Sequence, residues 1–342
     1  MDDPRTNAYI ADMLAQPDCL RRLNITDVSR AIAPIAGAIG NYRHIILTGM
    51  GSSYSALRPM WLALVETGHP AWLVDTAECL GHFAPMIDAS TLVIAASQSG
   101  RSAEIVALAE QIRSRGGTLL AITNDPASPL AQHASAIVDI GVGIENSVST
   151  KTYLNTLGVG LAISRIVLQR GHDDVLERTA DLLDSYLESW RQRTEEIKAA
   201  ISLPERLYFL ARGQSLATAE YGALIAKEAA RWPVEALNGP QFRHGPLELA
   251  DERLTAVILA GTDAAARQHN LALHNDLLGF GARSFWLDTG VEAGPLAIPR
   301  TAADAVCIVE AVPLQLLSVA LAEQSGISAG SFRHLKKVTT VL

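Results

Sequence analysis

Cysteine and positive charge are both scarce in this sequence of 342 residues. The cysteines, Cys19, Cys79 and Cys307, lie far apart and form no metal-binding spacing, so we expect no bound metal and a reducing, cytoplasmic setting. Lysine and arginine number 28 against 36 acidic residues, which gives a formal net charge of −8. This balance argues against nucleic-acid binding, which needs clustered basic surface. It leaves room for a small anionic ligand in a locally positive pocket.

Long apolar runs are also missing. A membrane span needs about 20 uninterrupted apolar residues. The nearest candidate, residues 154–168, is shorter and contains Arg165, so it is predicted to be a buried helix. The first residues, Met1-Asp2-Asp3-Pro4-Arg5, lack the basic and apolar regions of a signal peptide. We therefore expect no contact with a membrane.

Short apolar runs alternate with helical patterns through most of the chain. Residues 7–40 have apolar positions at helical spacing, with a break and a helix cap at residues 24–27. From residue 44 on, strands alternate with helices, which predicts an α/β fold with parallel sheets covered by helices on both faces. The predicted strands are 45–48, 71–74, 91–96, 118–123, 136–140, 207–211, 256–260, 284–287 and 305–309.

The second half of the chain repeats the first. Residues 207–215 fall on residues 45–53 at an offset of 162 positions, and residues 256–263 match the strand and turn around Ser97 without its serines. We predict an N-terminal part over residues 1–170, a linker helix over 171–200 and a second domain over 201–342. Alternatively, residues 171–200 form one more core helix of a single large domain.

The most informative stretch is Ser97-Gln98-Ser99-Gly100-Arg101-Ser102, which follows the apolar run 91–96 and precedes a helical pattern. A helix N-terminus offers unpaired N–H groups and a partial positive charge, so an oxyanion is a natural ligand there. The hydroxyls and Gln98 add further donors. Alternatively, one serine simply caps the helix. The cluster as a whole favours anion binding.

Two candidates for proton transfer follow in the second half. Glu228 ends a mostly apolar helical turn, and His244 lies between two Gly-Pro pairs, at 239–240 and 245–246, that fix its loop. A histidine exchanges protons near neutral pH. The basic tail over residues 331–340 also carries apolar residues, so it can pack and bring Lys337 to a pocket.

These segments resemble the two-domain form of the sugar isomerase (SIS) family, found in the isomerase half of glucosamine-6-phosphate synthase, in type II glucosamine-6-phosphate deaminases and in fructosamine-6-phosphate deglycases. The resemblance covers the chain from about residue 30. It implies two tandem SIS domains, each a flavodoxin-like three-layer sandwich. The motifs that carry it are Gly51-Ser52-Ser53, Ser97-Gln98-Ser99-Gly100-x-Ser102, Ser149-Thr150-Lys151, Lys227-Glu228, His244-Gly245-Pro246 and Leu335-x-Lys337.

The resemblance also implies roles for these residues. Glu228 would move a proton between C1 and C2 of an opened sugar, so we expect it to be partly desolvated. His244 would assist ring opening from the neighbouring subunit of a homodimer, and Lys337 would form a Schiff base with a ketose. No cofactor is implied. The substrate-binding residues would be Ser52, Ser53, Ser97, Gln98, Ser99 and Ser102 for the phosphate, and Val148 and Ser149 for the sugar.

We therefore expect an aldose–ketose isomerase-type enzyme acting on an anionic hexose, with an amino-sugar 6-phosphate deaminase or isomerase as the first choice. The amidotransferase half of the synthase and its catalytic cysteine are missing, so glutamine-driven synthesis is not expected. Ile225 stands where amino-sugar enzymes usually carry a lysine, Met50 replaces a cysteine of the synthase, and residues 145–149 are one residue short.

These departures keep other functions open. One alternative is a fructosamine-6-phosphate deglycase, which residues 242–248 resemble. Another is an isomerase of a non-amino sugar whose anion is a phosphate or a sulfonate. In another class stands a non-catalytic sugar-phosphate sensor. The sensor is disfavoured because nothing before residue 40 has the basic character of a DNA-binding helix.

Overall fold

The computed structural model describes residues 3, 6–171, 174–290 and 294–334. Their contacts divide the chain into two compact units, each built on one sheet. The first-sheet unit contains residues 19–144 and 151–174. The second-sheet unit contains residues 1–18, 145–150 and 175–334. Segments 1–18 and 145–150 thus fold with the second half of the chain.

The first-sheet unit is built on parallel strands in the order β2-β1-β3-β4-β5. β3 is buried at every position, which explains why its sequence is a continuous apolar run and does not alternate. The strand order reverses between β1 and β3, where Gly49 pairs with Ala96. Open α/β sheets bind ligands at such a switch point. The strands are β1 (His44–Gly49), β2 (Ala71–Asp75), β3 (Thr91–Ala96), β4 (Thr118–Thr123) and β5 (Ala136–Asp139).

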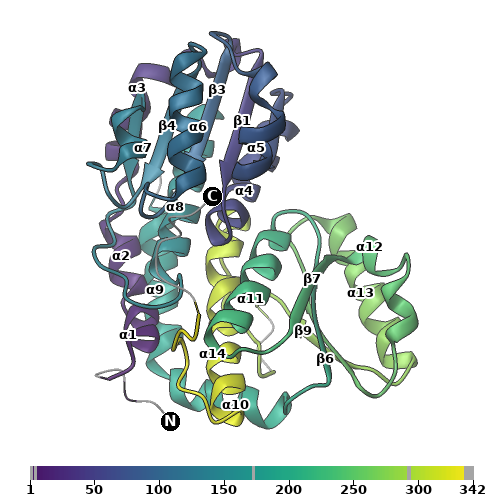
Figure 1. The fold of residues 1–342 in the computed structure, drawn as a ribbon. Coiled ribbons are helices and arrows are strands. Elements are labelled where there is room, and N and C mark those ends of the chain that lie inside the picture. The colour runs from purple at the N-terminus through teal and green to yellow at the C-terminus, as the bar shows by residue number, and fades with distance from the viewer. Residues whose placement is uncertain (1–2, 4–5, 172–173, 291–293, 335–342) are drawn as a thin grey trace. The chain divides into compact units, whose positions relative to one another are not determined.

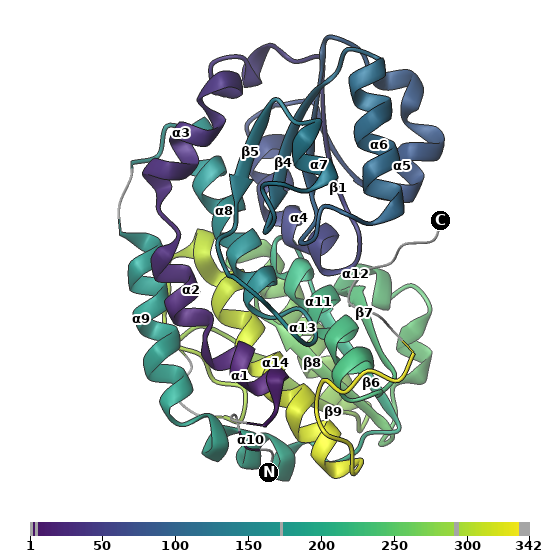
Figure 2. The ribbon, with the colours of Figure 1, turned by 60° about the vertical axis from the view of Figure 1, so that its left-hand side comes forward.

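Helices cover both faces of this sheet (Figures 1 and 2), as the alternating pattern predicted. On one face Ile105 and Leu108 of α6 pack against strand residues such as Val93. On the other face α8 is buried along most of its length, which confirms the buried helix predicted there. The first face carries α5 (Thr76–His82), α6 (Ala103–Ser114) and α7 (Pro129–Gln132), and the other carries α3 (Ile25–Ala36), α4 (Ser52–Glu66) and α8 (Lys151–Val167).

The N-terminal helices are α1 (Ala8–Leu14), α2 (Gln16–Arg22) and α3. The predicted break lies before α3, where the Asn24 side chain accepts a hydrogen bond of 2.8 Å from the Thr26 N–H. This bond satisfies one of the N–H groups that a helix start leaves unpaired.

The second-sheet unit repeats the arrangement with parallel strands in the order β7-β6-β8-β9. Its switch point lies between β6 and β8. α11 and α14 cover one face, and α12 and α13 cover the other. The strands are β6 (Arg206–Ala211), β7 (Val234–Asn238), β8 (Leu254–Leu259) and β9 (Arg283–Leu287), and the helices are α9 (Val175–Glu188), α10 (Trp190–Ala200), α11 (Ser215–Ala229), α12 (Gly239–Phe242), α13 (Ala264–Gly279) and α14 (Val306–Gln324).

Two expectations for the second half are wrong, at residues 305–309 and 171–200, and one strand was missed. Residues 305–309, predicted as a strand, contain the start of α14, because burial continues past this run through Ala322. Tertiary burial here overrides the strand preference of β-branched residues. Edge strand β7 was not predicted, since most of it is only partly buried and it carries exposed Glu235. The helix predicted over residues 171–200 is interrupted at Ser189, between α9 and α10.

The segment Ala303–Gln324, which contains α14, has the length and apolar composition of a membrane span. Its apolar window is entirely buried inside the protein. The three cysteines are buried and form no disulfide with one another.

Candidate active site

The stretch of residues 97–102, called the serine turn below, lies at the carboxyl end of β3, at the switch point of the first sheet. Ser97 Oγ accepts a hydrogen bond from the Gly100 N–H (3.1 Å), and Ser99 Oγ accepts one from the Arg101 N–H (3.2 Å). Ser102 stands at the N-cap of α6 but makes no side-chain capping bond. Because the serine oxygens accept within the turn, their O–H groups can donate to an anion. The alternative that one serine simply caps the helix is not supported by a side-chain capping bond at Ser102.

Residues at and after the end of β4 hold the serine turn in place. The Gln98 carbonyl accepts hydrogen bonds from the Asn124 N–H (3.0 Å) and the Thr123 hydroxyl (3.3 Å) at the end of β4. Gly100 has φ +58°, and a Cβ there would lie 2.2 Å from Ser128 Oγ. Only glycine satisfies both conditions. The close packing at this position fixes the shape of the turn.

The Arg101 side chain forms an ion pair with Asp125, whose Oδ2 lies 2.5 Å from Arg101 Nη2. This hydrogen bond lowers the pKa of Asp125. The positive character of the turn therefore comes from hydroxyls, peptide N–H groups and the start of α6, which has 12 residues.

A second helix starts beside this turn. β1 ends at Gly49, level with the end of β3, and α4 begins at Ser52. Gly51 has φ +54°, and Ser52 and Ser53 are half-buried in the first turn of α4. The structure therefore gathers Ser52, Ser53 and the serine turn at one edge of one sheet.

The other predicted sugar-binding residues belong to the second-sheet unit. Val148 is buried and Ser149 is half-buried in the segment 145–150. Glu145 accepts hydrogen bonds at Oε1 from the Thr150 N–H (2.9 Å) and hydroxyl (3.3 Å). The Ser149 carbonyl accepts one of 2.8 Å from the hydroxyl of Tyr221 on α11. This unit therefore joins the segment to the helix that carries Glu228.

Glu228 lies in the last turn of α11 and is half-buried, whereas its neighbour Lys227 is exposed. Near it is Tyr9 of α1, which is fully buried and whose hydroxyl lies 2.8 Å from Ser318 Oγ. Burial raises the pKa of Tyr9, and the negative charges of Glu228 and Glu145 raise it further. Two carboxylates thus act on one buried phenol.

His244 is exposed in the turn between α12 and the short 3₁₀ helix Pro246–Leu249. Its N–H donates to the Gln241 carbonyl (3.0 Å), and the preceding Arg243 pairs with Asp276 at 2.7 Å. The flanking prolines begin both short helices, as expected for a fixed loop. Lys337 lies outside the described residues.

The switch point of the second sheet has a different content. Ser215, at the start of α11, is fully buried and donates to Glu310 Oε1 at 2.9 Å. The Gln214 amide donates to the Thr262 hydroxyl (2.8 Å) and the Ala303 carbonyl (2.7 Å). Burial raises the pKa of Glu310 to about 8. Side chains of the chain itself therefore occupy this edge.

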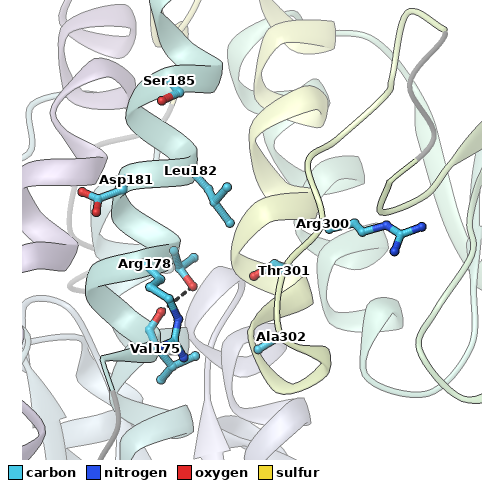
Figure 3. Close-up of a pocket in the computed structure, with 9 residues that line it drawn as sticks. Val175, Arg178, Asp181, Leu182, Ser185, Arg300, Thr301 and Ala302 are labelled. Atoms are coloured by element: carbon cyan, nitrogen blue, oxygen red, sulfur yellow. Dashed lines mark hydrogen bonds between the residues drawn. The ribbon is translucent and has the colours of Figure 1, made fainter.

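A groove of about 510 Å³ lies elsewhere in the second-sheet unit, between α9 and the residues that lead into α14 (Figure 3). Asp181 and Ser185 of α9 line it, with Thr301 and Ala302 opposite, while the Arg300 guanidinium points away from α9. None of the predicted site residues that the structure describes lines this groove.

Sequence reasoning missed Tyr9, Glu145 and Tyr221. Tyr221 stood out only as a polar-tipped aromatic residue among the small residues of the helix that carries Glu228. Its partner Ser149 is 72 positions away in sequence. No local pattern reports a contact of that separation.

Two doubly wound α/β units in one chain, one with a hydroxyl-lined turn at its switch point, define the class of protein. The chain belongs to the SIS domain family, whose model matches residues 39–163 and 200–275. This confirms the family and fold predicted from the sequence.

The chain is also similar in sequence to two curated proteins. The chain is 27% identical to the isomerizing glutamine-fructose-6-phosphate aminotransferase of Pyrococcus horikoshii, over 97% of this chain and 57% of that protein. It is 30% identical to the enzyme of the same name from Thermococcus kodakarensis, over 91% of this chain and 54% of that one. The chain therefore spans about half the length of these relatives.

Solved structures share the fold over nearly the whole chain. Glucosamine-6-phosphate deaminase from Thermotoga maritima matches with a TM-score of 0.76 and 20% identity, covering 98% of this chain and 100% of its own. Tagatose-6-phosphate ketose/aldose isomerase from Escherichia coli matches with a TM-score of 0.80 and 17% identity, covering 96% and 95%. At these identities the likeness concerns the fold.

Proposed function

We propose that this protein is a sugar-phosphate enzyme of the aldose–ketose isomerase type, with an amino-sugar 6-phosphate as its first candidate substrate. The observation that carries the proposal is the serine turn, whose hydroxyl groups are oriented by the turn itself and stand at two helix N-termini. Such a site suits a phosphate monoester. The names of the relatives, an aminotransferase, a deaminase and an isomerase of hexose 6-phosphates, support this substrate class.

In this proposal Ser52, Ser53 and residues 97–102 bind the phosphate, and Val148 and Ser149 contact the sugar. Glu228 takes a proton from one of the carbons C1 and C2 and returns it to the other, while the hydroxyl proton moves to the former carbonyl oxygen, so that the carbonyl is exchanged between the two carbons. A half-buried carboxylate suits this work, because partial desolvation makes it a stronger base. Anchoring the distant phosphate holds the reacting carbons in place.

His244 and Lys337 complete the proposed chemistry. His244 would assist ring opening in the neighbouring subunit of a homodimer, a role that its exposed position in a fixed turn supports. Lys337 would hold an open-chain ketose as a Schiff base. We further propose a cytoplasmic location, supported by three cysteines that form no disulfide with one another. Light scattering at twice the 36.5 kDa chain mass would support the homodimer.

Fully buried Ile225 favours a second candidate, an isomerase of a non-amino acidic sugar. It lies three residues before Glu228, where the amino-sugar enzymes usually carry a lysine. A sulfonated sugar also fits this candidate, because hydroxyl and N–H donors recognise an oxyanion whatever its central atom.

The test is incubation of the chain with glucosamine 6-phosphate, with ammonia and fructose 6-phosphate both measured. Ammonia release supports the deaminase. Ketose formed from glucose 6-phosphate without ammonia would move the assignment to the second candidate. No turnover of either substrate despite tight binding would favour a sensor.

Glu228→Gln should lower turnover roughly 10²–10⁴-fold, the usual contribution of a general base. The matched control is Glu220→Gln, at a half-buried position of the same helix. Steady-state rates on the substrate that the wild type converts provide the comparison. Equal rates for Glu228→Gln and the control would remove residue 228 from the mechanism.

A further inference from the structure

A chain of buried hydrogen bonds runs from α14 through α11 to the segment 145–150. The amides of Gln315 and Gln16 bind each other reciprocally at 2.8 Å. Gln315 Nε2 also donates to the Tyr221 hydroxyl (2.9 Å), and this hydroxyl donates to the Ser149 carbonyl (2.8 Å). Gln16, Tyr221 and Gln315 are fully buried, so the bonds among these three side chains form away from competing water, whereas the bond to the Ser149 carbonyl is partly buried.

Tyr221 lies on the same helix face as Glu228. The two residues are seven positions apart, which is close to two turns and about 10 Å along the helix axis. One rigid element therefore carries both the carboxylate and the hydroxyl that holds the Ser149 carbonyl. Loss of the hydrogen bond from Tyr221 would therefore let the Ser149 carbonyl move relative to Glu228.

Other bonds fasten the same segment elsewhere. The Asn146 N–H donates to Asp12 Oδ2 (3.0 Å), and the Ser147 hydroxyl donates to the Gly330 carbonyl (2.9 Å). These bonds hold the first half of the segment, whereas the Tyr221 bond acts directly at Ser149. The Gln16–Gln315 pair fixes the Tyr221 hydroxyl in turn, because the only proton of that hydroxyl goes to the carbonyl while its oxygen accepts from the amide.

We propose that Tyr221 is a positioning residue for the sugar end of the substrate, acting through the Ser149 carbonyl. The inference rests on the proposed function, in which Ser149 contacts the sugar and Glu228 moves its proton. It assigns the alignment of these two residues to one phenol hydroxyl and its buried amide support.

The test compares two probes by titration calorimetry, sorbitol 6-phosphate, which is an open-chain hexitol, and inorganic phosphate. Tyr221→Phe keeps the buried ring and removes only the hydroxyl. We expect it to weaken sorbitol 6-phosphate binding about tenfold, with phosphate affinity unchanged within twofold and one site per folded chain. The matched control is Tyr42→Phe, which removes a hydroxyl bound to Thr118 in the first-sheet unit and should change neither affinity.

A purely structural role would lower both affinities together or reduce the number of sites, and either result overturns the inference, as does unchanged hexitol binding. If Tyr221→Phe does not fold, Gln315→Met removes the amide donor at similar volume and should weaken hexitol binding about threefold. No weakening would again overturn it.

The proposed function fails separately. Selective hexitol loss in Tyr221→Phe, with no turnover by the wild type, would confirm the positioning role and reject the enzyme. A wild type that binds the hexitol no better than phosphate would overturn both proposals.

Discussion

The carboxyl edges of the two sheets have the same backbone plan and opposite side-chain arrangements. At the first sheet, Gly51 has a positive φ and is followed by Ser52 and Ser53, which begin α4 and are half-buried. At the second, Gly213 also has a positive φ and α11 starts at Ser215, but this serine is fully buried against Glu310. The fold provides a crevice twice, and the side chains decide whether it receives a ligand or the chain's own carboxyl group.

The strongest way to break this comparison is at the glycines. Gly100→Ala combines a positive φ with a Cβ 2.2 Å from Ser128 Oγ, so it should lower the unfolding free energy by roughly 2–5 kcal/mol and abolish phosphate binding. Gly213 also has a positive φ, but a Cβ there would meet no described atom beyond its chain neighbours within 4 Å. Gly213→Ala should therefore lower the unfolding free energy by about 1–2 kcal/mol and leave phosphate affinity unchanged. Urea denaturation and phosphate titration measure both. Retained phosphate affinity in Gly100→Ala would contradict the assignment of the turn.

A second pair of variants separates binding from folding. Ser99→Ala removes a donor from the proposed anion site, so phosphate affinity should fall about 10- to 100-fold with a loss of stability under about 1 kcal/mol. Ser215→Ala leaves a buried Glu310 oxygen without its donor, so it should cost roughly 1–3 kcal/mol without changing phosphate affinity. The same two assays apply. If both variants behaved alike, the contrast between the two edges would be unfounded.

The smallest predicted effect concerns the step from pH 7 to pH 8. Burial raises the pKa of Glu310 from 4.5 to about 8, so the folded chain keeps a proton that the unfolded chain releases. Stability should therefore fall as pH rises from about 4.5 and level off above about 8, with a loss of about 1 kcal/mol between pH 7 and 8 from this group.

Glu310→Gln imitates the protonated acid and should remove that loss. Urea unfolding at pH 7 and pH 8 tests this. The control is Glu104→Gln, beside the serine turn, which should leave the loss in place. An identical pH dependence in the wild type and Glu310→Gln would show that residue 310 does not titrate in this range.

Most of the fold followed from local patterns. The buried parallel strands have short apolar runs in their sequence, which predicted them. The glycine turns at residues 51 and 213 indicated the internal repeat. Failures occurred where burial overrides propensity, as in residues 305–309, and where an edge strand carries little apolar signal, as in β7. Both are properties of the packed chain that local patterns do not encode.

The candidate site divides in the same way. The serine turn is continuous in sequence, so its position at a strand end was predicted together with its residues. The support of Ser149 was not predicted, because Tyr221 reaches it from 72 positions away and Gln315 in turn binds Tyr221 from 94 positions away. That residues 145–150 fold with the second half of the chain follows from such contacts alone.

The seating of α1 has a consequence for biosynthesis. Tyr9 is fully buried, its hydroxyl meets Ser318, and a Cβ on Gly330 would lie 2.6 Å from its own Cβ. The ribosome makes this helix before its partners at residues 318 and 330, whereas nearly all of residues 19–174 emerge in one continuous stretch. The first-sheet unit can therefore fold once residues 19–174 have been made, whereas α1 can dock only after residues 318–330 have been synthesised.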